Sequence, residues 1–310
     1  MVRFELTKIT RTGWPSVAAL PRDHNSLSRA RGGHGGPPIQ VVSGPRSLRL
    51  LMMQRRRFYA PPDSISREVA LLSREESHHL TRVLRLKPGD EVFVFDGCGR
   101  EYRCEFLKVE QARAKLLVVD QLADVVESPH SVRLGQALAK GEKFDFIVQK
   151  ATELGVSSIV PLITDHADVK LAEVRSEKKL ERWRRISLEA LKQCGRRTLV
   201  DIEPPIAVGK FLERPARDID GPTASSVIVF SEKGGLLIAD ALRGMTSGSR
   251  LTALIGPEGG WSEDEFSLFA ATGVRAVTLG PRTLRTETAA IAAITLIQHT
   301  LGDLSAALRQ

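Results

Sequence analysis

The sequence predicts an α/β protein in which a small all-β domain precedes a larger domain built on a mainly parallel sheet. Two patterns in the 310 residues support this fold class. From Arg55 to about Val126, short apolar runs alternate with period two and are interrupted by one short helix. From Val132 onward, strands alternate with helices, and repeated βα units place helices on both faces of a parallel sheet.

The composition is that of an ordinary globular chain, with 42% hydrophobic and 26% charged residues. The sequence has no run of apolar residues long enough to span a membrane. Its three cysteines, Cys98, Cys104 and Cys194, lack CxxC spacing. We therefore expect a reducing, cytoplasmic compartment, with neither a disulfide framework nor a metal site.

The net charge of +8 is concentrated at the N-terminus. Residues 1–53 contain eight Lys or Arg and only two acidic residues, so the rest of the chain is nearly neutral. Their glycine-rich stretch, residues 31–38, cannot bury enough apolar surface to fold alone. Three interpretations remain for residues 1–53: a disordered basic extension, a transit peptide, or untranslated sequence upstream of Met52–Met53.

The small domain should contain one short helix among its strands. Ser73 reads as an N-cap with Glu76 three residues later, which predicts a helix through Leu84. The expected strands are 91–95, 101–106 and 114–119. The glycine-rich segment Asp96–Gly99 is followed by period-two alternation rather than by a helix, so we expect a β-hairpin turn and not a Rossmann nucleotide motif.

Basic residues of this domain could meet an RNA backbone, which is recognised mainly by Lys and Arg. One group lies at the start of the domain and another on or just beyond the helix. A further candidate, Arg196, follows a long helix rich in Lys and Arg. On charge alone such a helix is more often just a solvated face. The predicted RNA-binding residues are Arg55, Arg56, Arg57, Arg82, Arg85, Lys87 and Arg196.

Residues 127–131 read as a linker to the larger domain. The expected strand and helix pairs are 132–137 with 142–154, 158–163 with 176–193, 227–230 with 236–242, 251–255 with 263–271, and 276–279 with 287–301. Ser262–Glu265 is a capping box that starts the helix at 263. The last helix is apolar on nearly every side, so it is either central to the core or covered by a second subunit.

Two loops leave strands of this sheet, at Leu254–Trp261 and at Leu279–Ala289. Ligands in open α/β sheets bind outside the carboxyl ends of strands, so the two loops predict one crevice with two walls. The glycines allow main-chain contacts to a flat heterocycle, whereas Glu258 and the lack of a following Lys-Ser or Lys-Thr argue against a phosphate loop. Taken alone, the first loop could equally be a tight strand-to-helix turn.

The ordered motifs from about residue 55 to the C-terminus resemble the ribosomal RNA small subunit methyltransferase E family of the SPOUT, or trefoil-knot, superfamily. The most specific are Leu-Ile-Gly-Pro-Glu-Gly-Gly from Leu254 and Leu-Gly-Pro-Arg-x-Leu-Arg-Thr-Glu-Thr-Ala from Leu279. Further matches are Arg56–Tyr59, His78–Leu80, Arg85–Leu86, Gly141–Lys143, Gln149–Lys150, Glu153–Val156 and Gln193–Arg196.

The resemblance implies a PUA-like RNA-binding barrel over residues 54–126 and a SPOUT methyltransferase domain over residues 132–306. In that domain we expect the strand exit Phe230–Lys233 to supply a third wall of the crevice. It also implies a homodimer, S-adenosyl-L-methionine as methyl donor, and N3 of a uridine in 16S ribosomal RNA as acceptor. Only the resemblance supports a knot, because chains as a rule do not thread. The expected cofactor-binding residues are Leu254, Ile255, Gly256, Pro257, Glu258, Gly259, Gly260, Leu279, Gly280, Leu284 and Thr286.

Methylation of uracil N3 needs a fixed cation beside the developing negative charge, and Arg285 is the candidate. Its alternative role is a surface ion pair with Glu287 or Glu258. Glu287 is the second catalytic candidate, although it could also act only on the helix dipole; Thr286 would cap that helix. Glu258, Glu287 and solvent remain open as the general base.

One departure from the family pattern is Thr164-Asp165-His166, where Ser-Glu-Arg is expected, so an RNA contact there is in doubt. Two other functions stay open on the sequence. A SPOUT enzyme could methylate a ribose 2'-hydroxyl of tRNA or rRNA, and a non-catalytic ribosome assembly factor could use the barrel alone.

Overall fold

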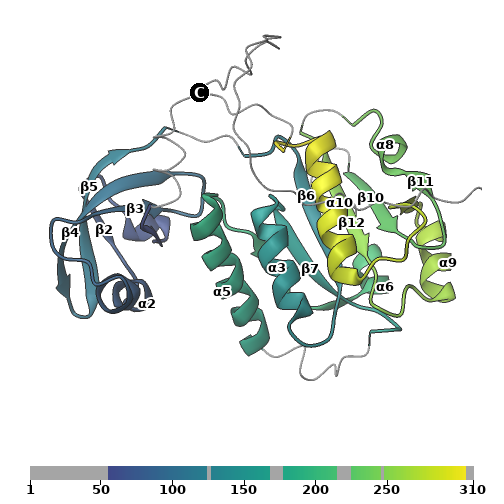
Figure 1. Ribbon diagram of the computed structural model, residues 1–310, viewed down its shortest axis with the longest axis horizontal. Helices are drawn as coiled ribbons and strands as arrows, with labels where there is room; N and C mark the ends of the chain where they lie inside the picture. The colour runs from purple at the N-terminus through teal and green to yellow at the C-terminus, as the bar shows by residue number, and fades with distance from the viewer. Residues whose placement is uncertain (1–54, 124–126, 168–176, 215–224, 246–247, 305–310) are drawn as a thin grey trace, which may run out of the picture. The chain divides into compact units, whose positions relative to one another are not determined.

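The computed structural model describes residues 55–123, 127–167, 177–214, 225–245 and 248–304, and Figure 1 shows the arrangement of their helices and strands. The expected N-terminal extension, residues 1–53, lies outside the described residues. The predicted fold class is confirmed: a small antiparallel domain precedes an α/β domain whose sheet is parallel.

The small domain is a five-stranded half-barrel with strand order β1-β3-β4-β5-β2. In chain order its strands are β1 (Arg57–Tyr59), β2 (Val69–Leu71), β3 (Glu91–Phe95), β4 (Glu101–Glu110) and β5 (Arg113–Gln121). Strand β1 runs parallel to β3, and the other pairs are antiparallel. A 3-10 turn at Pro62–Ser64 lies between β1 and β2. Alternate strand residues form a buried cluster that includes Phe58, Val94 and Leu116.

The helix of this domain begins where the capping signal predicts. Helix α2 (Arg74–His78) has Ser73 as its N-cap, whose hydroxyl accepts from the Glu76 amide at 3.1 Å. The helix then widens into a π-helical turn, His79–Val83, closed by the Leu84 amide on the His79 carbonyl. Arg85 follows with φ of 53°, a left-handed conformation that is uncommon outside glycine.

The hairpin between β3 and β4 is also confirmed. Asp96 Oδ1 accepts from the amides of Cys98 at 2.7 Å and Arg100 at 3.1 Å, so the carboxylate holds the turn closed. Gly97 and Gly99 both have positive φ, which this turn requires. The carbonyl of Gly97 accepts from the Leu199 amide, so the turn also touches the chain that follows helix α5 (Glu177–Cys194).

The larger domain has a parallel sheet in the order β11-β13-β10-β12-β6-β7-β8, with β9 also paired to β7. Its strands are β6 (Ser131–Ala137), β7 (Ser158–Ile163), β8 (Asp201–Ile202), β9 (Ile206–Ala207), β10 (Ser225–Phe230), β11 (Leu236–Leu237), β12 (Arg250–Ile255) and β13 (Arg275–Thr278). Besides α5, its helices are α3 (Lys143–Glu153), α6 (Val208–Leu212), α8 (Ile238–Ala241), α9 (Glu263–Ala271) and α10 (Thr286–Thr300).

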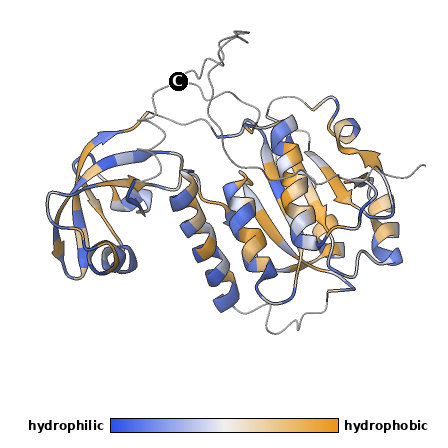
Figure 2. Ribbon diagram, in the orientation of Figure 1, coloured by the Kyte–Doolittle hydropathy of each residue, from blue (hydrophilic) through white to orange (hydrophobic). Residues whose placement is uncertain are grey.

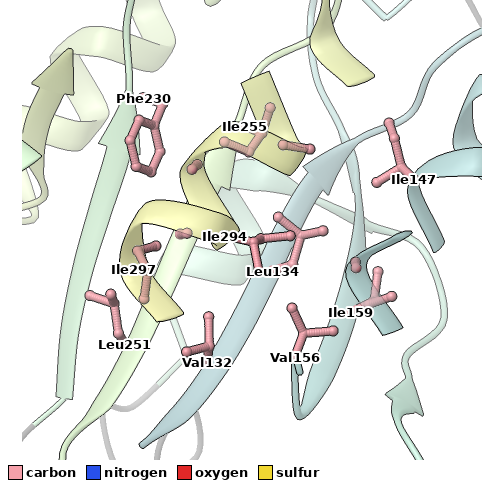
Figure 3. Close-up of a cluster of buried hydrophobic side chains, with 14 of the residues drawn as sticks. Val132, Leu134, Ile147, Val156, Ile159, Phe230, Leu251, Ile255, Ile294 and Ile297 are labelled. Carbon is pink, nitrogen blue, oxygen red and sulfur yellow. The ribbon is translucent and has the colours of Figure 1, made fainter. Parts of the chain in front are cut away.

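Residues alternate between the two faces of this sheet, so each strand contributes to two cores. Ile228, Ala253 and Ile255 pack with helices α3, α5, α8 and α10 on one face, where Figure 3 shows Ile294 and Ile297 beside Leu134 and Val132. Val229 and Leu254 pack with α6 and α9 on the other face. The central strands are mainly hydrophobic, whereas α5 carries long hydrophilic stretches (Figure 2).

A buried network of charges joins the half-barrel to the end of α5. The Arg57 guanidinium bonds the Glu101 carboxylate at 2.6 Å and donates to the carbonyls of Leu191 and Arg196. Arg197 reaches the same carboxylate at 3.0 Å. Removing one partner of a buried pair leaves an uncompensated charge, so loss of any one of these side chains should be destabilising.

Candidate active site

The candidate active site lies where three neighbouring strands end. Because β10 lies between β12 and β13 and all three are parallel, their carboxyl ends meet at one edge of the sheet. The pocket there is lined by Phe230, Ser231, Glu232, Ile255, Gly256, Pro257, Gly260, Trp261, Leu279, Gly280, Arg282, Leu284, Thr286 and Ala289. The expected crevice between the two loops is present, and the exit of β10 supplies its third wall.

The first loop needs glycine because other groups approach its backbone closely. A Cβ atom on Gly256 would lie 3.0 Å from the Trp261 indole nitrogen, which donates to the Phe230 carbonyl at 3.0 Å. Gly260 has φ of 71°, and a Cβ there would lie 2.8 Å from a carboxylate oxygen of Glu232. Larger residues at these positions would therefore displace two walls of the pocket.

Helix α9 begins directly after this loop, and its capping box is confirmed. The Ser262 hydroxyl accepts from the Glu265 amide, and the Glu265 carboxylate accepts from the Ser262 amide. The end of β7 also touches the loop: His166 Nδ1 lies 3.2 Å from the Gly260 carbonyl, and the Ser262 hydroxyl donates to Asp165 at 2.6 Å. Two residues of the segment that departs from the family pattern, Asp165 and His166, therefore contact the first loop and the start of α9.

The second loop ends at α10, but its cap differs from the prediction. Arg285 is the N-cap, with φ of −65° and ψ of 151°, and its side chain makes no capping bond. Thr286 is instead the first helical residue, and the predicted N-cap role for it is wrong. Its hydroxyl donates to the Gly256 carbonyl at 2.7 Å, so the start of α10 is tied to the first loop.

Most of the predicted cofactor-binding residues line the pocket. Ile255, Gly256, Pro257, Gly260, Leu279, Gly280, Leu284 and Thr286 do so. Leu254 does not, because alternation along β12 turns its side chain into the core against α6 and α9. Glu258 and Gly259 also lie outside the lining, at the exposed tip of the first loop.

Sequence reasoning missed three lining residues that its motifs contained. Trp261 directly follows the glycines and packs against Phe269. Arg282 is the arginine of the second loop that precedes Arg285 by three residues. Ala289 lies three residues after Thr286, and this helical spacing could have indicated that both face the pocket.

Arg285 and Glu287 flank Thr286 without lining the pocket themselves. Arg285 is exposed and forms no ion pair with any described residue, so the alternative pairing with Glu287 or Glu258 is not observed. Glu287 has a buried carboxylate oxygen, Oε2, that lacks a hydrogen-bond partner in the described part of the chain. Such an oxygen is costly to leave unpaired.

Glu258 has a partner of a different kind. Its carboxylate lies 2.7 Å from Lys143 Nζ, at the start of α3. Burial raises the pKa of Glu258, but the hydrogen bond from Lys143 and contacts to backbone amides outweigh burial and leave that pKa below its ordinary value. A carboxylate with a lowered pKa is a weaker base, so the pairing with Lys143 argues against Glu258 as a general base.

The predicted RNA-binding residues separate into exposed and buried groups. Arg82, Arg85 and Lys87 are exposed on the π-helical turn and the loop after it, beside the exposed Val83 and Leu84. The Arg56 side chain is 48% exposed and lies 3.9 Å from Asp90. The Arg55 side chain is 20% exposed and stacks over Phe93.

Arg57 and Arg196 are held inside the protein, which contradicts the expected RNA contact. Arg57 belongs to the buried network with Glu101. The Arg196 guanidinium bonds the Glu127 carboxylate at 2.6 Å and donates to the carbonyls of Thr152 and Val156. Their donors are used within the fold, so the charge of these two residues was a poor guide to RNA binding.

Three further features of the described residues concern metal ligands, cysteines and membrane-spanning helices. The described residues contain no cluster of three His, Cys, Asp or Glu side chains that could hold a metal ion. All three cysteines are free, and burial raises the pKa of the Cys104 thiol to about 12. None of the helices in the described ranges is long and apolar enough to cross a membrane.

Comparison with known proteins identifies two family models in this chain. Residues 126–298, more than half of the chain, match an RNA methyltransferase domain. Residues 72–118 match an RNA methyltransferase PUA domain. The two matches fall on the parallel-sheet domain and on the half-barrel respectively.

Two similar sequences carry the same name. The chain is 34% identical to ribosomal RNA small subunit methyltransferase E of Synechocystis over 79% of its length and 78% of the relative. The protein of that name from Bacillus subtilis is 32% identical over 73% and 88% of the two chains.

Among solved structures, ribosomal RNA small subunit methyltransferase E from Neisseria gonorrhoeae, bound to S-adenosyl methionine, superposes with a TM-score of 0.71 at 32% identity, covering 81% of this chain and 99% of that one. A protein from Legionella pneumophila in complex with the same cofactor gives a TM-score of 0.73 at 31% identity, covering 81% and 100%. This chain therefore belongs to the ribosomal RNA small subunit methyltransferase E family.

Proposed function

We propose that this protein transfers a methyl group from S-adenosylmethionine to N3 of a uridine in 16S ribosomal RNA of the small subunit. The observation that carries the proposal is the pocket built from both glycine loops and the exit of β10. Support comes from the family relatives named for small-subunit ribosomal RNA and from the similar structures that contain S-adenosylmethionine.

The pocket residues fit this cofactor. Ile255, Leu279, Leu284 and Ala289 offer apolar surface to an adenine ring, and the glycines leave main-chain groups open to its polar edge. Glu232 and Arg282 place one negative and one positive side chain at the same pocket, which suits the ammonium and carboxylate of a methionine moiety. When bound, S-adenosylmethionine supplies a methyl group activated by its sulfonium.

Arg285 and Glu287 are proposed as the catalytic residues. The unpaired, exposed guanidinium of Arg285 is available to stabilise negative charge on the uracil ring as N3 loses its proton. The Oε2 atom of Glu287, which has no hydrogen-bond partner among the described residues, is the proposed acceptor of that proton. Both residues are sequence neighbours of the pocket-lining Thr286 at the start of α10.

We further propose that Arg82, Arg85 and Lys87 contact the phosphate backbone of the RNA, with Arg56 and Arg55 at the edge of the same domain. The first three side chains form no ion pair within the described ranges, so their charge is available to a polyanion. Arg57 and Arg196 are not part of this proposal, because their donors are occupied inside the fold.

A homodimer is proposed on the character of α10. One side of this helix is buried in the core through Ala290, Ile294 and Ile297, while Leu296 remains 38% exposed. A second subunit would cover that apolar surface.

Free cysteines agree with a cytoplasmic location, which is also a proposal.

The test is cofactor binding by calorimetry, with variants that alter one glycine each. Gly256→Ala should weaken S-adenosylmethionine binding by about tenfold or more, because its Cβ would displace Trp261. Gly209→Ala in α6 is the matched control: its Cβ would meet Leu268 at an ordinary 3.6 Å, away from the pocket, and binding should be unchanged. A wild-type protein that does not bind S-adenosylmethionine would refute the proposal.

A further inference from the structure

Gln136 lies at the end of β6, behind the pocket and outside its lining. Its side chain is fully buried. The amide nitrogen Nε2 donates to the Ala137 carbonyl at 2.9 Å and to the Thr286 hydroxyl at 3.0 Å. The Thr286 hydroxyl donates in turn to the Gly256 carbonyl at 2.7 Å. These contacts form a buried relay of hydrogen bonds from Gln136 through Thr286 to Gly256.

The direction of the relay is determined by its chemistry. A carbonyl oxygen can only accept, so Ala137 fixes the Gln136 amide with its NH2 group toward Thr286. The Thr286 hydroxyl has one proton, which goes to the Gly256 carbonyl, and its lone pair therefore accepts from Gln136. Successive bonds of this kind polarise and strengthen one another in a buried environment.

The relay joins three segments that are distant in the chain: the end of β6, the first glycine loop and the first turn of α10. Gly256 and Thr286 both line the pocket, and Arg285 and Glu287 flank Thr286. Its geometry therefore sets the spacing between two pocket walls and the helix turn that carries the proposed catalytic residues.

We infer that Gln136 is a positioning residue of the active site, which holds Thr286 and the Gly256 carbonyl in place for cofactor binding without touching the cofactor. The inference rests on the proposed function, because it concerns the same pocket. Without the Gln136 donor, the Thr286 hydroxyl loses one of its two partners and the two loops lose a shared anchor. A pocket that must be ordered on binding holds its ligand less tightly.

A second buried glutamine provides a matched control. Gln298 in α10 is also fully buried and donates from Nε2 to a backbone carbonyl, that of Gly155, at 2.8 Å. Its Oε1 atom, like that of Gln136, has no partner among the described residues. Gln298 lies 12 residues beyond Thr286 on the same helix, about 18 Å along the axis. Loss of this side chain should affect stability but not the pocket.

The experiment measures the Kd of S-adenosylmethionine by calorimetry and the Tm for Gln136→Leu, Thr286→Val, the double variant and Gln298→Leu. We expect Gln136→Leu and Thr286→Val each to raise Kd about tenfold to about 100-fold. The Kd of the double variant should be no higher than that of the weaker-binding single variant, because both changes break the same relay.

Gln298→Leu should lower Tm as much as Gln136→Leu does, with Kd within about twofold of wild type. The inference is overturned if Gln136→Leu binds S-adenosylmethionine as tightly as wild type. It is also overturned if the effects of Gln136→Leu and Thr286→Val on the binding free energy add in the double variant, or if Gln298→Leu weakens binding as much as Gln136→Leu does. Should Gln136→Leu fail to fold, Thr286→Val compared with Gln298→Leu tests the relay from its other end. Failure of the wild-type protein to bind would instead refute the proposed function itself.

Discussion

At the scale of single residues, Arg285 has an exposed guanidinium with no ion-pair partner among the residues the structure describes. If it stabilises charge on the uracil, Arg285→Ala should reduce kcat by about 100-fold to about 1000-fold, as loss of an oxyanion donor does. Single-turnover methyl transfer checks this. The Kd for S-adenosylmethionine and the Tm should remain at wild-type values, and near-normal turnover would remove Arg285 from the mechanism.

The two candidate carboxylates can be separated by the same assay. Glu287→Gln should lower kcat by about 100-fold or more, because the amide cannot accept the N3 proton. Glu258→Gln should lower it by less than about tenfold, since that carboxylate is paired with Lys143 and has a lowered pKa. Equal losses in the two variants, or a larger loss for Glu258→Gln, would contradict the assignment of the base.

Residue roles followed from the sequence where the local chain determines them. Ser73 and Ser262 cap helices because each signal lies within four consecutive residues. Arg57 and Thr286 were misread because their partners are far away in sequence: Glu101 for Arg57, and Gly256 for Thr286. Spacing along one segment carries no information about such contacts.

At the scale of elements, the periodic spacing of hydrophobic residues predicted most helices and strands of the large domain. Helix α9 and strand β7 have the predicted bounds, β12 differs by one residue at one end, and α3, α5 and α10 differ by one residue at each end. Short strands such as β8, β9 and β11 were not expected, because two residues show no period. Strand β1 was also missed as a separate element, since it pairs in parallel with β3 and not with a chain neighbour.

The segment after α5 should respond to pH through Glu127. Burial raises the pKa of this carboxyl, but Arg196 and the amides of Arg197 and Thr198 outweigh burial and hold its pKa below the ordinary value. Its contribution to stability is therefore present above the ordinary carboxyl pKa and is lost as pH falls through the lowered folded-state value.

Urea unfolding measures this contribution directly. At about pH 7, Glu127→Gln should lower the free energy of unfolding by about 2 kcal/mol, the scale of hydrogen bonds to a charged group. The difference between wild type and variant should shrink steadily below about pH 4, as the wild-type carboxylate becomes protonated. A difference that is constant across this range would show that the charge of Glu127 contributes nothing.

The exposed turn after α2 should act as an RNA contact. Replacing Arg82, Arg85 and Lys87 with alanine should weaken binding of small-subunit ribosomal RNA and reduce the dependence of log K on log salt by about 2 to 3 in slope. Arg243→Ala, another exposed arginine, in the larger domain, is the control and should change neither quantity. An unchanged salt slope in the triple variant would place the RNA elsewhere.

At the scale of the whole molecule, the strand order decides where the two loops meet. The sequence placed both at strand ends but contained no signal that β10 would lie between β12 and β13. That order requires the chain after β13 to pass the carboxyl end of β10 before α10 packs against β12 and α3. A knotted path through these loops stays a prediction from the family resemblance.

The central claim is that this pocket and the turn beside it methylate a uridine base in small-subunit RNA. The most direct measurement incubates the purified protein with S-adenosylmethionine and small subunits from a strain lacking the gene, then locates the new methyl group by nuclease digestion and mass analysis. The account predicts one N3-methyluridine in 16S RNA, absent when Arg285 is alanine. A methyl group on a ribose 2'-hydroxyl, or no transfer by a protein that binds S-adenosylmethionine, would contradict it.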